Sequence, residues 1–205
     1  MFFPFYDSTY ILVLIGVIVS MMASAKLNAT YQRYSAVRSM CGLTGAEAAK
    51  RLLNSQGIYD VTIRRVPGSL TDHYDPRSKT VNLSDAVYGS TSIAAIGVAA
   101  HECGHAMQDA ADYSPLRIRA ALVPAANLGS QLAWPLILVG LLLGSGGSGL
   151  AFAGIVLFSL AVLFQLVTLP VEYNASHRAV TYVAAAAASI LQLLRLLMLF
   201  NRRRD

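Results

Sequence analysis

The chain has 205 residues, of which 55% are hydrophobic and only 13% are charged. Soluble domains carry about 25% charged residues, so the composition argues against a soluble protein and predicts a mostly α-helical protein that crosses a lipid bilayer several times. The net charge of +5 does not predict nucleic-acid binding, because no known nucleic-acid-binding motif accompanies the scattered basic residues.

The first apolar segment, residues 10–25, has no charged residue and lies between Asp7 and Lys26. With the aromatic residues before it, the segment is long enough to reach across a bilayer. We therefore expect residues 1–25 to form a membrane anchor that the mature protein keeps. The alternative is a cleaved signal peptide, since residues 23–25 resemble a cleavage site, but the first ten residues contain no Lys or Arg.

Residues 26–118 carry most of the polar side chains and predict one small α+β domain with a short β-sheet. A first helix is expected at 26–40. A second helix is better defined, because Thr44 and Glu47 have the spacing of a capping box and Gly57 can end the helix. The domain is therefore expected to open with two helices.

Two strands and a long helix follow in the same domain. Alternating apolar and polar residues at 61–64 and at 80–83 predict the strands, with the polar and aromatic segment 70–76 between them. The strand at 80–83 could bind an extended peptide if it lies at a free edge of the sheet. Residues 92–109 contain no proline and many alanines, which predicts one mostly buried helix.

The tract 120–171 contains no Asp, Glu, Lys or Arg. It is long enough for two membrane crossings, and the glycine- and serine-rich residues 144–149 divide it as a flexible loop. We expect a second membrane helix at 119–143, with kinks at its prolines, and a third at 150–170.

The chain ends with an apolar helix and a basic tail, residues 183–205. The domain 26–118 carries most of the Lys and Arg residues of the chain, and basic segments tend to stay in the cytoplasm. We therefore expect this domain on the cytoplasmic side of a bacterial inner membrane. The second and third membrane helices then return residues 171–182 to that side. A spanning last helix would put residues 202–204 outside, so we expect this helix to lie at the interface or re-enter, or the number of spans to differ by one.

Residues 101–105 of the long helix form an H-E-x-x-H motif. His101 and His105 are one turn apart on one helix face, where both imidazoles can bind the same zinc ion. Glu102 is then placed to take a proton from a zinc-activated water. A chance match is a weak alternative, because the chain has only four histidines and burying such polar groups is costly without a function. Cys103 faces away from the metal and is expected to fill the core.

A catalytic zinc commonly has three protein ligands and one open position. Glu172 is the first choice for the third ligand, because it is the only acidic residue between Asp112 and Asp205 and it lies next to a predicted membrane helix. His73 and His177, the two remaining histidines, are the alternatives.

Three ordered segments, HECGHAMQ, LTDHYDPRSKTVNLS and LPVEYNASHRA, resemble the bacterial YugP-type neutral zinc metallopeptidases over most of the chain. That family is distantly similar to the HtpX-type membrane proteases, whose third ligand is a Glu that opens an E-x-x-A-D pattern. The resemblance implies a zincin-like domain at 26–118 and a gluzincin-like site with Glu172 as third ligand. Ser176 stands here where the relatives carry Asp, so Asn174 or Ser176 is expected to orient a ligand histidine instead.

A further departure from the family concerns the last helix. The relatives carry an additional polar helical segment after the E-x-x-A pattern. Here Arg178 is followed almost directly by apolar residues from Thr181 onward, which leaves the placement of the last helix open.

The predicted function is zinc-dependent endopeptidase action on membrane or membrane-proximal polypeptides, with Glu102 as general base. The oxyanion formed during peptide hydrolysis needs a donor, and the candidates are His73, Tyr74, His177 and Arg178, each equally well explained as a turn or surface residue. The alternatives are a zinc hydrolase of a non-peptide amide or ester and a non-catalytic membrane scaffold with a structural zinc. Glu102 argues against the scaffold, because a structural site needs no base.

Overall fold

The computed structural model describes the backbone of residues 9–201 and the side chains of residues 11–180 other than Ser145. The predicted basic tail 202–204 lies outside the described residues. The protein is mostly helical with one small sheet, which confirms the predicted fold class. Its elements are α1 (Thr9–Ser35), α2 (Gly45–Ser55), β1 (Thr62–Val66), β2 (His73–Asp75), β3 (Thr80–Ser84), α3 (Asp85–Tyr88), α4 (Ile93–Ala110), α5 (Ser114–Leu142), the 3-10 helix η1 (Gly144–Gly147) and α6 (Ser148–Asn201).

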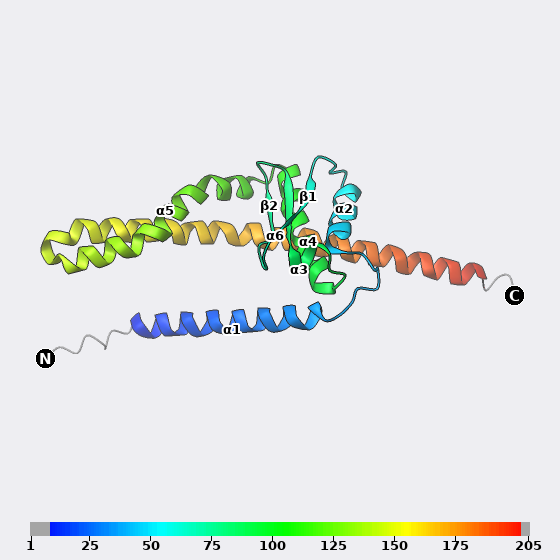
Figure 1. The fold of residues 1–205 in the computed structure, drawn as a ribbon, viewed down its shortest axis with the longest axis horizontal. Helices are drawn as coiled ribbons and strands as arrows, with labels where there is room; N and C mark the ends of the chain where they lie inside the picture. The colour runs from blue at the N-terminus through cyan, green and yellow to red at the C-terminus, as the bar shows by residue number, and fades with distance from the viewer. Residues whose placement is uncertain (1–8, 202–205) are drawn as a thin grey trace.

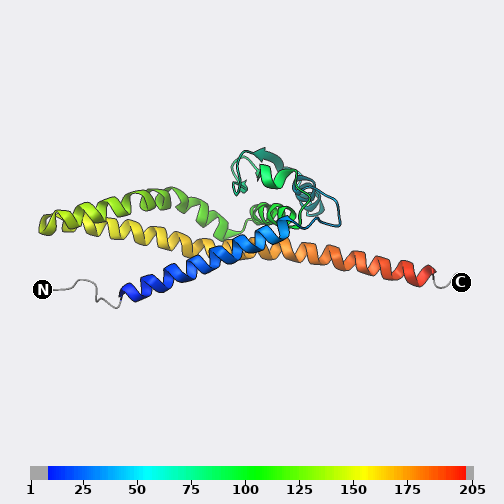
Figure 2. The ribbon, with the colours of Figure 1, turned by 60° about the horizontal axis from the view of Figure 1, so that its bottom comes forward.

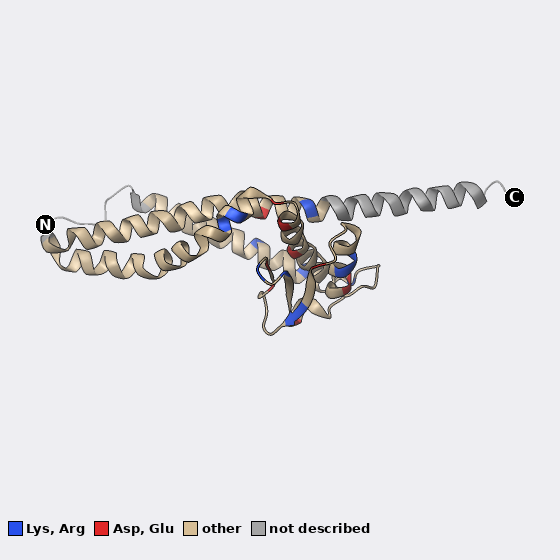
Figure 3. Ribbon diagram, turned by 90° about the horizontal axis from the view of Figure 1, so that it is seen from above, with Lys and Arg blue, Asp and Glu red and all other residues tan. Residues whose placement is uncertain are grey.

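Among the described residues, three helical segments are long and apolar enough to cross a membrane: Ile11–Ser35 of α1, Ser114–Leu142 of α5 and Ser148–Val180 of α6. Helices α5 and α6 run antiparallel as a long hairpin, and α1 extends to the same side of the small α/β part as this hairpin (Figures 1 and 2). Charged residues gather around the α/β part and the base of the hairpin, whereas the part of the hairpin that extends away from the α/β part shows none (Figure 3). The described part of the chain therefore has an apolar hairpin and a polar α/β part at the base of this hairpin.

The hairpin is held by close backbone contacts at small residues. A Cβ added at Gly129 of α5 would lie only 2.7 Å from the carbonyl oxygen of Leu157 in α6. Such close approach between membrane helices requires small side chains. The predicted flexible loop at 144–149 is instead the short 3-10 helix η1, in which Gly144 has a φ of 59° that suits glycine.

Two of the predicted helix boundaries differ from the structure. The helix expected at 26–40 is the continuation of the anchor helix in α1, because Lys26 marks a change of polarity and does not break a helix. The segment 171–182 likewise lies within α6, which continues past Pro170 to Asn201. The limits of the membrane-crossing segments themselves remain predictions.

The sheet has the strand order β1–β3–β2, with β1 parallel and β2 antiparallel to β3. The strands predicted at 61–64 and 80–83 are confirmed, within two residues, as β1 and β3. Strand β2 forms in the segment that was expected to be a polar connection. The hypothesis that 80–83 offers a free edge to a peptide is wrong, because β3 pairs with a strand on each side.

Helix α4 carries the H-E-x-x-H motif through the centre of the α/β part. Ser92 caps its first turn. The side chain of Cys103 is fully buried and its Sγ contacts the carbonyl oxygen of Ala49 in α2 at 3.7 Å, so Cys103 fills the core as predicted. Helix α2 begins with the predicted capping box of Thr44 and Glu47.

Candidate metal centre

The candidate site forms where α4 crosses α6. A Cβ added at Gly104 would lie only 2.3 Å from the carbonyl oxygen of Ala175, so the two helix backbones touch at this glycine. The face of α6 that packs inward carries Val171, Ala175 and Ala179, all buried and spaced by four residues. Glu172 directly follows Val171. His101 lies three residues before Gly104, and His105 directly follows it. The crossing therefore brings together residues that are about 70 positions apart in the sequence.

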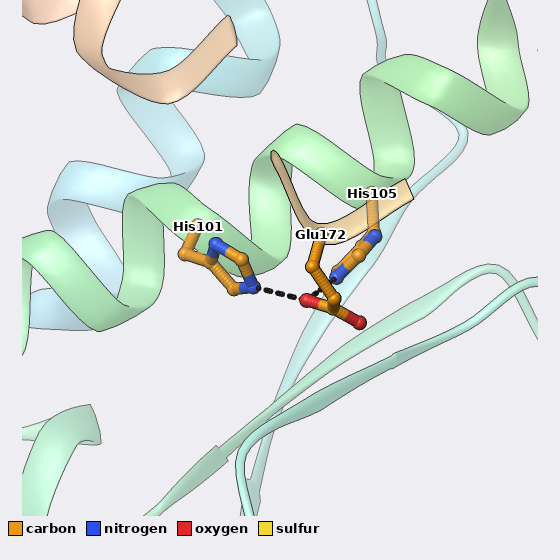
Figure 4. Close-up of side chains that lie close together, drawn as sticks. All are labelled: His101, His105 and Glu172. Atoms are coloured by element: carbon orange, nitrogen blue, oxygen red, sulfur yellow. Dashed lines mark hydrogen bonds and ion pairs between the residues drawn. The ribbon is translucent and has the colours of Figure 1, made fainter. Parts of the chain in front are cut away.

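His101, His105 and Glu172 converge on one point (Figure 4). The Nε2 atom of His101 lies 3.1 Å, and that of His105 3.4 Å, from Oε2 of Glu172. One donor atom from each residue lies within 4.8 Å of the other two. Two imidazole nitrogens and a carboxylate oxygen at these separations can share one ion. These are the three residues that the sequence suggested as metal ligands.

Both imidazole rings are held at Nδ1, the atom opposite the point of convergence. Nδ1 of His105 lies 3.0 Å from Oε1 of Gln108. Because an amide oxygen only accepts, His105 donates from Nδ1 and keeps the lone pair of Nε2 for a metal. Nδ1 of His101 lies 3.1 Å from Oγ of Ser176. Asn174 acts one step away, because it accepts from the amide of Gln108.

Two residues at the site were missed by sequence reasoning. Gln108 is fully buried, and its Nε2 donates to the carbonyl oxygen of Val171 at 2.8 Å, which ties α4 to α6. Arg119 places Nη2 3.4 Å from Oε1 of Glu172, and its buried Nε has no hydrogen-bond partner within the described part of the chain. The sequence did contain a signal for each residue. Gln108 is a polar residue one turn after His105 on an apolar helix, and Arg119 is the last basic residue before the uncharged tract.

Glu102 lies beside the metal ligands in an apolar setting. Its side chain is buried and, with His101, borders a cavity of about 510 Å³. Burial raises the pKa of Glu102, against the opposing attraction of His101 and His105. Its carboxylate makes no side-chain hydrogen bond or ion pair with the other described residues. The carboxylate oxygens are therefore available to a water molecule.

The structure does not bring His73 or His177 to the point of convergence. Neighbouring residues of a strand face opposite sides of a sheet, so His73 faces away from the side on which Tyr74 reaches α4. Its Nδ1 lies 2.8 Å from the carbonyl oxygen of Thr71. His177 is exposed on α6 and follows Glu172 by five residues, which is about 140° around the helix axis.

Tyr74 and Arg178, the other two candidate donors, differ in their distance from the site. Tyr74 lines a smaller cavity of about 190 Å³ together with His105 and Arg119. Its hydroxyl donates to Oδ2 of Asp109 at 2.8 Å. Burial, and then this hydrogen bond, raise the pKa of Tyr74, so the hydroxyl stays protonated. Arg178 donates instead to Asn174 of α6, and its guanidinium lies 5.9 Å from the ring centroid of Tyr113 at the start of α5.

Comparison with known proteins identifies the family of this chain. The model of a family described as "Putative neutral zinc metallopeptidase" matches residues 9–181. A protein of Bacillus subtilis (strain 168) named "Putative membrane protease YugP" is 44% identical over 213 residues, which cover 91% of this chain and 94% of that relative. No solved structure matches the chain.

Proposed function

The chain belongs to the family described as "Putative neutral zinc metallopeptidase", and from this premise we propose that it is a membrane-bound, zinc-dependent endopeptidase. The observation that carries the proposal is the convergence of His101, His105 and Glu172 within 4.8 Å, next to the buried carboxylate of Glu102. The substrate would be a polypeptide in the membrane or close to it.

The residues at the centre fit a zinc ion. Two imidazoles and one carboxylate are a donor set of catalytic zinc sites, which keep one position open. The amide oxygen of Gln108 selects the tautomer in which His105 offers Nε2 to the metal. The hydroxyl of Ser176 can accept from Nδ1 of His101 and so permits the same tautomer there. Cys103 does not join the set, because its Sγ contacts α2. A site with three protein ligands argues against a structural zinc, which usually has four.

Zinc, when bound, would supply Lewis acidity that lowers the pKa of water to about 7. Glu102 would take the proton of the attacking water and pass it to the leaving amine, since its carboxylate borders the cavity beside His101. We assign Arg119 as the donor to the carbonyl oxygen as negative charge develops there. Tyr74 is the weaker candidate, because it already donates its only hydroxyl hydrogen to Asp109.

The arrangement of the apolar helices supports a site at the cytoplasmic surface of the inner membrane. The three candidate spans leave the α/β part on the same side (Figure 2). Basic residues flank two uncharged stretches where these meet the α/β part, since Lys26 follows the first stretch and Arg119 precedes the tract 120–171. Basic residues in such positions are typical of the cytoplasmic side.

The test compares the purified wild-type chain with Glu102→Gln, both in lipid nanodiscs. Zinc content is measured by atomic emission, and cleavage is measured on soluble and membrane-tethered polypeptides. We expect both proteins to bind one zinc ion and the variant to cleave about 10²–10⁴-fold more slowly, the usual contribution of a general base. Equal cleavage by the two proteins would contradict the mechanism. Hydrolysis of small amides or esters without any polypeptide cleavage would favour the alternative hydrolase.

A further inference from the structure

An apolar cavity of about 510 Å³ lies between the end of α1 and the first half of α4. Its wall on α4 follows one helix face, with Ile93, Gly97 and His101 spaced by four residues, and Glu102 borders the same end as His101. The cavity therefore opens onto a proposed zinc ligand and the proposed general base. The smaller cavity of about 190 Å³ borders His105, so each of the two candidate histidine ligands has a cavity beside it.

Two features of this cavity are costs to stability that an apolar occupant would explain. A Cβ added at Gly97 would meet no heavy atom within 4 Å, although glycine is among the least favourable residues inside a helix. Leu70 at the rim is 75% exposed and has a φ of 59°, a conformation that is uncommon for a bulky residue. Gly97 therefore leaves space in the cavity, and Leu70 presents an apolar side chain to this space.

The wall that α1 contributes lies next to the predicted membrane surface. Lys26 ends the uncharged stretch of α1, and Leu27, Tyr31 and Tyr34 in the following turns line the cavity. Tyr34 is about 12 Å along the helix from Lys26, and tyrosine is enriched at membrane–water interfaces. A polypeptide that enters the cavity would therefore lie close to the bilayer surface.

We propose that this cavity binds a bulky apolar side chain, of the size of Leu, Met or Phe, next to the scissile bond of the polypeptide substrate. The inference rests on the proposed function, because it assigns the cavity to the same hydrolytic site. The cavity of about 510 Å³ is large enough to hold any of these side chains, and its lining is almost wholly apolar. Asp72 also lines the cavity, where Ser84 donates to both of its carboxylate oxygens.

The experiment uses the zinc-loaded full chain in nanodiscs and matched peptides that carry Leu, Phe, Ala or Asp on either side of the cleaved bond. The wild-type protein is expected to prefer Leu and Phe on one side. Gly97→Leu fills the cavity from α4 and is expected to lower kcat/KM for these peptides by roughly 10–200-fold, the range for an apolar pocket contact, with little change for the Ala peptides. Leu70→Asn removes the apolar side chain and keeps the left-handed backbone, which asparagine tolerates. This variant is expected to weaken the preference for the Leu and Phe peptides.

Ala110→Leu is the matched control, because it adds the same side chain to α4 at an exposed position outside both cavities. This variant should keep the wild-type selectivity. Zinc content and melting temperature are measured for every variant. Cleavage without an apolar preference, or a preference that survives Gly97→Leu in a zinc-loaded protein, overturns this inference alone. A lipid bound by the wild type and lost from Gly97→Leu, with peptide selectivity unchanged, also overturns it. If neither the wild type nor Glu102→Gln cleaves any peptide, the proposed function fails as well.

Discussion

The crossing of α4 and α6 at Gly104 provides a sharp test of how the metal centre is assembled. In Gly104→Ala the new Cβ would lie 2.3 Å from the carbonyl oxygen of Ala175. That oxygen belongs to a helix backbone and cannot rotate away. The helices would have to separate by about 1 Å to restore ordinary van der Waals contact.

A displacement of this size is large for a metal site, because zinc–ligand distances vary by only about 0.2 Å. Glu172, on the displaced helix, would lose its place relative to His101 and His105. We expect Gly104→Ala to lower zinc affinity by at least roughly 10–100-fold, the effect of losing a residue that orients a ligand. Overpacking should also lower the free energy of unfolding by about 1–3 kcal/mol. Zinc affinity is measured by competition with a chromophoric chelator, and folding is followed by the melting temperature.

Gly97→Ala is the control for this experiment, because it makes the same change on the same helix where the new Cβ meets nothing within 4 Å. Its zinc affinity should equal that of the wild type, and its helix should gain up to about 1 kcal/mol. A folded Gly104→Ala protein with wild-type zinc affinity would refute the idea that this close contact sets the ligand geometry.

Three further predictions concern individual side chains. Arg119→Met should lower kcat by about 10²–10³-fold with a much smaller effect on KM, because the donor is needed when the oxyanion forms. An unchanged kcat in the zinc-loaded variant would show that Arg119 has no part in the mechanism. Ser176→Ala should weaken zinc binding about tenfold or more in a chelator titration, because His101 loses its partner at Nδ1, and equal affinity would show that the contact is dispensable. In the folded protein a maleimide should label Cys41, which is exposed and whose pKa is lowered by a hydrogen bond with Ser39. Cys103 should not react, because burial raises its pKa to about 12, and equal labelling of both cysteines would contradict the packing of α4 against α2.

The candidate ligands could be proposed from the sequence because their signals are local or unopposed. His101 and His105 are one helical turn apart, and that spacing alone puts them on one face. Glu172 stood out because the apolar tract before it leaves few competing acids. The capping box at Thr44 and Glu47 is also a local pattern, and the structure contains it.

Other features depend on contacts that no local pattern encodes. The side of the sheet that His73 faces depends on β2, a strand of three residues whose pairing with β3 is set by tertiary structure. Gln108 and Arg119 acquire their roles only because α6 passes next to α4 and α5. The continuity of α1 past Lys26 could not be predicted from polarity, since a helix can leave a membrane without ending.

The most direct test of the central claim is X-ray absorption spectroscopy at the zinc edge of the zinc-loaded protein. The account predicts two imidazole nitrogens and one or two carboxylate oxygens at about 2.0–2.2 Å, together with one further oxygen from water. In Glu172→Ala, the carboxylate contribution should disappear. A first shell with sulfur at about 2.3 Å, or one that is unchanged by Glu172→Ala, would show that His101, His105 and Glu172 do not hold the ion together.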